Sequence, residues 1–260
     1  MKPAPFAYHA PSSIDEALAL LHEHGSDAKP LAGGQSLIPA MNFRLATPAV
    51  LVDLNRIASL SGVSRDTAGL QIGAMTRHRT LERSADVAEA APLVAAAMPY
   101  VAHAAIRTRG TLGGSLAHAD PAAELPAVML ALNASFTLAS RAGSRIVPAA
   151  GFFAGLFATA IEPGELLVGI TVPARADRSA AVFDEVSRRH GDFALAGGTG
   201  DEVGSHRWLS RNAGTRAIAA GPRLSCSSRA GTARPRWFAP RGCSGRARAG
   251  SGCCSGSGCR

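Results

Sequence analysis

The chain changes character near residue 200, and this break limits what can fold as one body. Residues 1–200 contain 16 lysines and arginines against 17 acidic residues, no cysteine, and apolar runs with helix-like and strand-like spacing. Residues 201–260 contain 11 arginines against two acids, together with all five cysteines and both tryptophans. The sequence therefore predicts a nearly neutral globular body followed by a basic tail, and not a basic domain throughout.

The composition of the body excludes several protein classes. Without cysteine it has neither a disulfide nor a thiolate metal site. The first residues lack the apolar segment of a signal peptide. The longest uncharged stretch, 17 residues between Glu89 and Arg107, is interrupted by two prolines and is shorter than the roughly 20 apolar residues of a membrane span. We therefore expect a cytoplasmic protein without a membrane span.

Apolar periodicity and capping signals indicate a mixed α/β or α+β body. Ser13 and Glu16 have the spacing of a capping box, and Gly25 follows the apolar face, which predicts a helix between Ser13 and Gly25. A second helical region, residues 81–104, is split by two prolines. Further helices are expected at residues 122–132 and 152–160. The expected strands cover residues 29–31, 50–54, 70–75, 136–139, 145–147, 166–172 and 181–187.

Two glycine pairs interrupt these elements. The sequence reads AGGQS at residues 32–36 and TLGGS at residues 111–115. Adjacent glycines allow a tight turn and expose successive N–H groups, which bind anionic oxygens, and Ser36 and Ser115 add hydroxyl donors. The motifs predict two loops that face one pyrophosphate, with two ordinary turns as the alternative. Neither motif has the glycine spacing of a Rossmann fingerprint, and neither continues into the lysine of a P-loop.

Four separated segments favour the pyrophosphate site over two ordinary turns. They read KPLAGGQSLIPAMNFRLATP, TRGTLGGSLAHADPAAELPAVMLAL, PGELLVGITVP and FDEVSRRHGDFALAG. Together they resemble the FAD-binding medium subunits of molybdenum hydroxylases, the family of the carbon monoxide dehydrogenase medium chain and the xanthine dehydrogenase FAD subunit, over about residues 1–198. The resemblance implies an FAD domain of the p-cresol methylhydroxylase and vanillyl-alcohol oxidase type. In that fold a small N-terminal α/β subdomain and a larger, mostly antiparallel one clamp the flavin.

The resemblance also implies site residues. Glu124 would contact the adenosine or ribityl part of FAD, with a solvated carboxylate in the first turn of a helix as the alternative. The backbone of Leu167 would approach the flavin ring, with plain strand core as the alternative, and Phe193 would stack near the isoalloxazine. No side chain is expected to be catalytic or to bind a metal. The residues implied to line the pyrophosphate are Leu31, Ala32, Gly33, Gly34, Gln35 and Ser36 on one side and Thr111, Leu112, Gly113, Gly114 and Ser115 on the other.

The implied function is an FAD-containing electron-transfer subunit of an oxidoreductase. Electrons would come from a small subunit with a [2Fe-2S] centre and pass through FAD to an external acceptor. The substrate would be oxidised at molybdopterin on a large subunit, in a dimer of heterotrimers. Two alternatives stay open: a stand-alone flavin oxidoreductase of the same fold, and a protein whose basic tail binds nucleic acid. Since the body is nearly neutral, we do not expect a nucleic-acid partner.

The resemblance ends before the chain does. It implies an FAD-binding domain at residues 1–176 and the start of a truncated C-terminal domain at residues 177–198. Residues 199–260 are rich in Arg, Gly, Ser and Cys and match nothing in the family. We expect them to be disordered or the product of a frameshift, and we expect a chain with this end to assemble poorly. His78 and His118 lack partners at ligand spacing, so we expect them to be hydrogen-bonded core or loop histidines.

Overall fold

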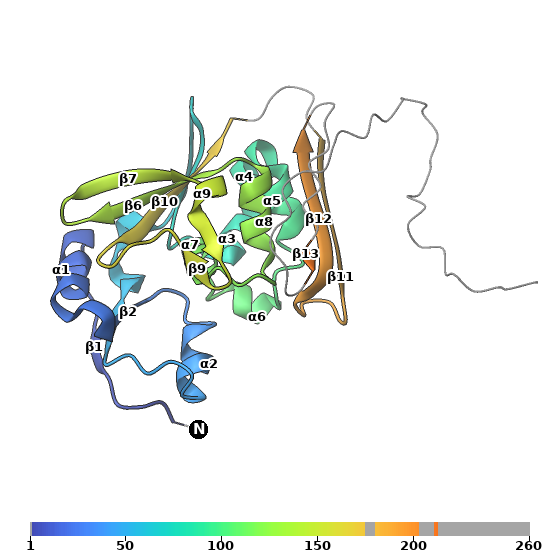
Figure 1. Cartoon of the computed structure of the whole chain (residues 1–260). Coiled ribbons are helices and arrows are strands. Elements are labelled where there is room, and N and C mark those ends of the chain that lie inside the picture. The colour runs from blue at the N-terminus through green and yellow to red at the C-terminus, as the bar shows by residue number, and fades with distance from the viewer. Residues whose placement is uncertain (1, 175–179, 203–210, 213–260) are drawn as a thin grey trace, which may run out of the picture. The chain divides into compact units, whose positions relative to one another are not determined.

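The computed structural model describes residues 2–174, 180–202 and 211–212 (Figure 1). The chain begins with a small parallel sheet in the order β1-β3-β2. Helix α1 packs on this sheet through Ala17, Leu18 and Leu21, which lie in one buried cluster with Val50 and Val52. The elements of this part are β1 Ala7–His9, α1 Ile14–His24, β2 Ala28–Leu31, α2 Leu37–Asn42 and β3 Val50–Asp53.

Helix α1 confirms the capping prediction with one difference. The Ser13 hydroxyl accepts a hydrogen bond from the Glu16 amide at 3.2 Å, and Gly25 ends the helix with φ 51°. The Glu16 carboxylate reaches back to the amide of Ser12 at 2.8 Å, one residue earlier than a standard capping box. The helix is therefore closed at both ends by local signals, and this is why sequence reasoning located it.

A five-stranded antiparallel sheet in the order β4-β5-β10-β6-β7 forms the larger part. One face carries the main core, in which Leu70, Ile72, Phe136 and Ile170 of the sheet pack with buried residues of the helices. The strands are β4 Val63–Asp66, β5 Gly69–Gly73, β6 Ser135–Ser140, β7 Gly143–Pro148 and β10 Leu166–Pro173; the helices are α3 His78–Arg83, α4 Ala85–Ala90, α5 Pro92–Ala97, α6 Ala104–Arg107, α7 Leu112–His118, α8 Glu124–Ala131 and α9 Ala149–Phe152.

Two of the expected helices differ from the sequence prediction. The helix expected at residues 152–160 is wrong: α9 ends at Phe152, and β8 Phe153–Gly155 pairs with β9 Ala158–Thr159. The helix expected at residues 122–132 begins only at Glu124, so that Pro121 lies in the turn before it. In both places the backbone follows contacts with distant residues, such as the hydrogen bond from the Phe157 amide to the Ala119 carbonyl at 3.2 Å.

A third sheet packs beside the helices. It consists of β11 Ala180–Ser187, β12 Ala194–Glu202 and β13 Arg211–Asn212, and Figure 1 shows β11 and β12 alongside α5 and α8. Phe183 faces inward, 5.1 Å from the ring of Tyr100, whereas Val182 and Val186 are exposed on the other face. Since β12 continues to Glu202, regular structure extends past residue 198, where the sequence pattern stops. The expected disorder or frameshift otherwise concerns residues outside the described ranges.

Candidate functional site

The two glycine motifs, far apart in sequence, lie against each other. The first fills the connection between β2 and α2, and the second begins α7. A methyl group added at Gly33 would lie 2.8 Å from the Gly110 Cα and closer still to the Arg109 carbonyl oxygen. One added at Gly114 would lie 3.3 Å from the Ala32 Cβ. The absence of side chains at Gly33 and Gly114 therefore allows the two backbones to approach this closely.

The first motif presents a row of unused backbone donors. Within the described part of the chain, no group accepts a hydrogen bond from the amides of residues 33–37. Gly34 has φ 72°, a left-handed conformation that suits glycine, and the first bond of the following helix runs from the Ile38 amide to the Gly34 carbonyl at 3.1 Å. Gln35 and Ser36 are exposed. This segment has the donors and the access that an anionic group requires.

The second motif is different, and here the sequence prediction is wrong in one respect. Its glycines lie inside α7 and not in an open loop, and its amides are used internally. The Leu112 amide donates to the Thr76 carbonyl at 3.0 Å and the Gly113 amide to the Ala74 carbonyl at 2.8 Å. The Gly114 and Ser115 amides both donate to Thr111, at its side-chain and backbone oxygens respectively. The second motif therefore supplies a closely packed wall and the Ser115 hydroxyl, whereas the free amides belong to the first.

His78 lies against the backbone at Gly110, just before the second motif. Its side chain is buried, its amide donates to the Gly110 carbonyl at 2.9 Å, and neither ring nitrogen makes a hydrogen bond of normal geometry within the described residues. The expectation of a hydrogen-bonded histidine is therefore not met. Burial lowers the pKa of His78 to about 4, against a smaller opposing effect of the Thr111 backbone. The imidazole is neutral at neutral pH and acts as a packing group under the second motif.

A partly buried ion pair holds the segment that leads into the second motif. The Arg107 side chain donates to both carboxylate oxygens of Glu82 at 3.2 Å and to the carbonyls of Val101 and Ala102 at 3.0 and 2.8 Å. Burial alone raises the pKa of Glu82, but hydrogen bonds from Arg79 and Arg107 outweigh it, and the pKa lies below its usual value. No sequence signal indicated this pair, because its partners lie on different helices.

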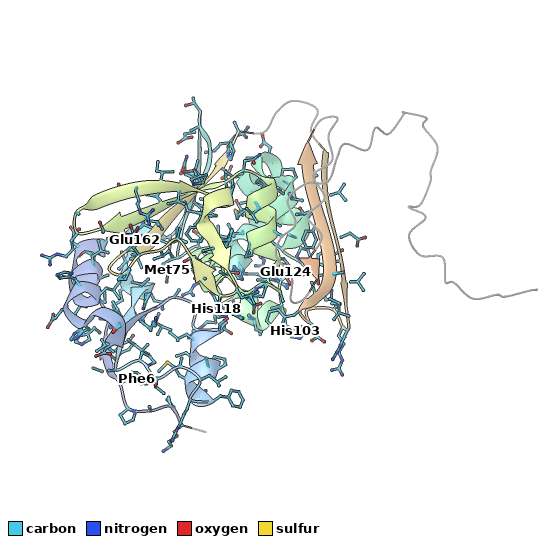
Figure 2. All side chains as sticks on the ribbon, viewed as in Figure 1. Phe6, Met75, His103, His118, Glu124 and Glu162 are labelled. Carbon is cyan, nitrogen blue, oxygen red and sulfur yellow. The ribbon has the colours of Figure 1, made fainter. Side chains whose placement is uncertain are left out.

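The remaining predicted residues fall in three different environments. Glu124 opens α8 with only 6% of its surface exposed, so the solvated carboxylate is wrong (Figure 2). Leu167 is buried in the main core opposite Leu138 of β6, as the alternative for its side chain predicted. Phe193 is 65% exposed immediately before β12. Within the described residues there is no group of three or more side chains that could hold a metal ion.

The sequence matches the family described as the FAD binding domain in molybdopterin dehydrogenase over residues 4–175. The chain belongs to this family. It is 47% identical over 197 residues to the alpha subunit of the 6-hydroxypseudooxynicotine dehydrogenase complex of Paenarthrobacter nicotinovorans, covering 76% of this chain and 67% of that protein. It is 45% identical over 197 residues to the carbon monoxide dehydrogenase medium chain of Hydrogenophaga pseudoflava, covering 76% and 69%.

Comparison of structures agrees with the sequence match. A chain in the structure of carbon monoxide dehydrogenase from Hydrogenophaga pseudoflava, which lacks the Mo-pyranopterin moiety of the molybdenum cofactor, superposes with a TM-score of 0.79 at 42% identity. The match covers 82% of this chain and 76% of that one. The mixed fold of this chain is therefore the fold of that FAD-binding family. Within the described ranges, no helix has the length and apolarity that crossing a membrane requires.

Proposed function

We propose that the chain binds FAD without a covalent bond, with the pyrophosphate between the two glycine motifs. The observation that supports this most directly is the row of unused amides at residues 33–37, in a motif that packs closely against the second one. A pyrophosphate carries the charge that such a row binds. The hydroxyls of Ser36 and Ser115 add donors on the two sides. We assign residues 1–176 to an FAD-binding domain of the p-cresol methylhydroxylase type.

The other contacts that we propose fall outside the pyrophosphate. Glu124 is held in place by burial, which suits a fixed contact to the adenosine or ribityl part. The Leu167 side chain is anchored in the core, so its backbone would present a fixed edge to the flavin ring. Phe193 is exposed and free to stack on an aromatic ring. Bound FAD supplies electron transfer between partners that carry one electron and acceptors that take two, and the chain supplies position.

We further propose that this flavoprotein serves a molybdenum hydroxylase in the cytoplasm. A large molybdenum subunit would oxidise the substrate, a small iron–sulfur subunit would deliver the electrons, and the assembly would be a dimer of heterotrimers. The support is the family membership and the names of the relatives, one of which is a carbon monoxide dehydrogenase medium chain. In this role no protein side chain is required as an acid or base.

The test is direct. The full chain is purified, incubated with FAD and desalted, and the retained nucleotide is released and identified. We expect one FAD per chain and no retention of FMN, because FMN lacks the pyrophosphate. A chimaera that carries the last third of the Hydrogenophaga pseudoflava medium chain after residue 198 is then co-expressed with candidate iron–sulfur and molybdenum subunits. An electron-transfer subunit co-purifies with them in this form, whereas a stand-alone oxidoreductase does not. A chain that retains no FAD under these conditions contradicts the proposal.

A further inference from the structure

A chain of side-chain hydrogen bonds connects the two glycine motifs through residues that belong to neither. Asn55 lies in the short 3-10 helix Leu54–Arg56 after β3, and its side-chain amide donates to the carbonyl oxygen of Ala32 at 3.0 Å. Its Oδ1 accepts a hydrogen bond from Nη2 of Arg77, the residue before α3. The second terminal nitrogen of Arg77 donates to the carbonyl oxygen of Arg109. The path therefore runs from the first motif to Arg109, two residues before the second.

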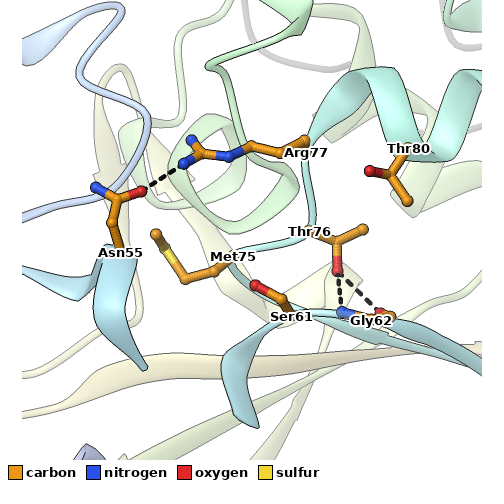
Figure 3. A pocket seen from close by; sticks show the side chains of 7 residues that line it. All are labelled: Asn55, Ser61, Gly62, Met75, Thr76, Arg77 and Thr80. Atoms are coloured by element: carbon orange, nitrogen blue, oxygen red, sulfur yellow. Dashed lines mark hydrogen bonds between the residues drawn. The ribbon is translucent and has the colours of Figure 1, made fainter. Parts of the chain in front are cut away.

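The position of the Arg109 carbonyl makes this path significant. It is the same oxygen against which the backbone of Gly33 packs, so Arg77 binds the atom at the contact between the motifs. Two further links hold Arg77 and Asn55. The backbone of Arg77 pairs with Thr111 in an isolated antiparallel bridge. The backbone amide of Asn55 donates to the Asp53 carboxylate at 2.9 Å. Figure 3 shows this hydrogen bond between Asn55 and Arg77. Both residues line a pocket of about 200 Å³.

We propose that Arg77, held by Asn55, is a positioning residue that fixes the separation of the two glycine motifs and thereby the width of the FAD pyrophosphate site. This inference rests on the proposed function. The planar guanidinium suits the task because its two terminal nitrogens donate in fixed and different directions, one to each side. A lysine ammonium has the same charge but no such fork. The free amides of the first motif bind a pyrophosphate well only when the second motif stands at the matching distance.

The experiment measures FAD affinity by flavin fluorescence in the full-length chain. Arg77→Gln, Arg77→Lys and Asn55→Ala are each expected to raise the Kd for FAD about tenfold, the scale of one lost hydrogen bond to a charged group. The double variant Asn55→Ala/Arg77→Gln is expected to bind no more weakly than the weaker single variant, because both changes break one path. Arg65→Gln, which removes an exposed arginine paired with Glu89 on the surface, is the control and should bind as the parent chain does.

Two readouts separate positioning from other roles. If Arg77 instead touched the phosphates, Arg77→Gln would reduce the salt dependence of the Kd, whereas positioning leaves that slope unchanged. A purely structural role would lower the urea midpoint of the FAD-free chain and would leave the visible circular dichroism of the bound flavin unchanged, whereas positioning alters that spectrum. Full affinity in Arg77→Lys, or additive losses in the double variant, overturns the proposal. A parent chain that binds no FAD overturns the proposed function instead, so the two failures are distinguishable.

Discussion

Gly33 of the first glycine motif packs on the backbone of Arg109, two residues before the second motif. The Gly33 backbone lies directly on the Arg109 carbonyl, and there is no room between them for even one methyl group. Contact of backbone with backbone cannot be relieved by turning a side chain, so a substitution at Gly33 must push the motifs apart. The width of the proposed site therefore depends on a position where nothing larger than hydrogen fits.

The first prediction follows from this contact. Gly33→Ala is expected to raise the Kd for FAD at least tenfold and Gly33→Val to abolish binding, because the added carbons separate the motifs. Gly151→Ala is the matched control, since Gly151 has open space around its Cα and an ordinary φ. Binding is measured by retention of FAD after desalting. Stoichiometric FAD in Gly33→Val would show that the contact does not form part of the site.

The second prediction concerns the cap of α7. Thr111 accepts a hydrogen bond from the Gly114 amide, so Thr111→Val is expected to lower the free energy of unfolding by about 1 kcal/mol. It should also weaken FAD binding, because the wall of the site loosens. Ser84→Ala removes the comparable cap of α4, where the hydroxyl accepts from the Val87 amide at 3.3 Å. That control should cost similar stability in urea and leave the Kd for FAD unchanged. Equal effects of both variants on FAD binding would contradict this assignment.

The third prediction concerns the partly buried pair of Arg107 and Glu82. Arg107→Ala leaves Glu82 with Arg79 alone and leaves the carbonyls of Val101 and Ala102 without their side-chain donor, with an expected loss of about 3 kcal/mol in the free energy of unfolding. Arg107→Lys should recover only part of this loss, because a lysine cannot reach both carboxylate oxygens and both carbonyls. Arg65→Gln on the exposed β4 should leave the urea midpoint unchanged. Full recovery by lysine would mean that charge alone is required.

The fourth prediction is a dependence of stability on pH. His78 has a pKa of about 4 in the folded chain against an ordinary value of 6.5, so the unfolded chain binds the extra proton between these values. Stability is therefore complete above pH 6.5 and falls as the pH drops toward 4, by up to about 1.4 kcal/mol per pH unit. His78→Gln should remove this slope. His22→Gln on the exposed side of α1 controls for loss of a histidine, and an unchanged slope in His78→Gln would refute the assignment.

The fifth prediction concerns the outer face of the third sheet. Val182, Val186 and Leu195 are 45–48% exposed there, and exposed apolar groups of this kind favour association. A chimaera that carries the last third of the Hydrogenophaga pseudoflava medium chain after residue 198 is expected to cover this face. Both forms should bind FAD, but only the chimaera should co-purify with iron–sulfur and molybdenum subunits and reduce a dye. Equal assembly of the two forms would show that this face plays no part in it.

Sequence reasoning succeeded where local signals decide the structure. The capped helix α1 and the hairpin of β6 and β7 around Gly143 follow from residues that are neighbours in the chain. It failed where distant contacts decide. The glycines of the second motif became helical because Thr76 and Ala74 accept hydrogen bonds from its first amides, and nothing within the motif encodes those partners.

The candidate site was likewise only partly predictable. The glycine pairs predicted where backbone donors would be needed, and the structure brings the pairs together. Which of the two retains free amides depends on the strands beside them, so the sequence assigned donors equally to both. Asn55 and Arg77 carried no signal at all, since their importance comes from a path through space between residues on separate elements.

The position of the proposed pyrophosphate site within the chain has a consequence for biosynthesis. The part of the chain that ends with Ser115 contains the free amides of the first motif, the second motif, and the Asn55 and Arg77 path. During translation these groups emerge from the ribosome while the later strands of the antiparallel sheet are still to come. Because β10 lies between β5 and β6 and contacts α7, the second motif is fully packed only after residues 166–173 have been synthesised. We therefore expect the nascent chain to bind FAD weakly at first, and its affinity to rise when β10 joins the sheet.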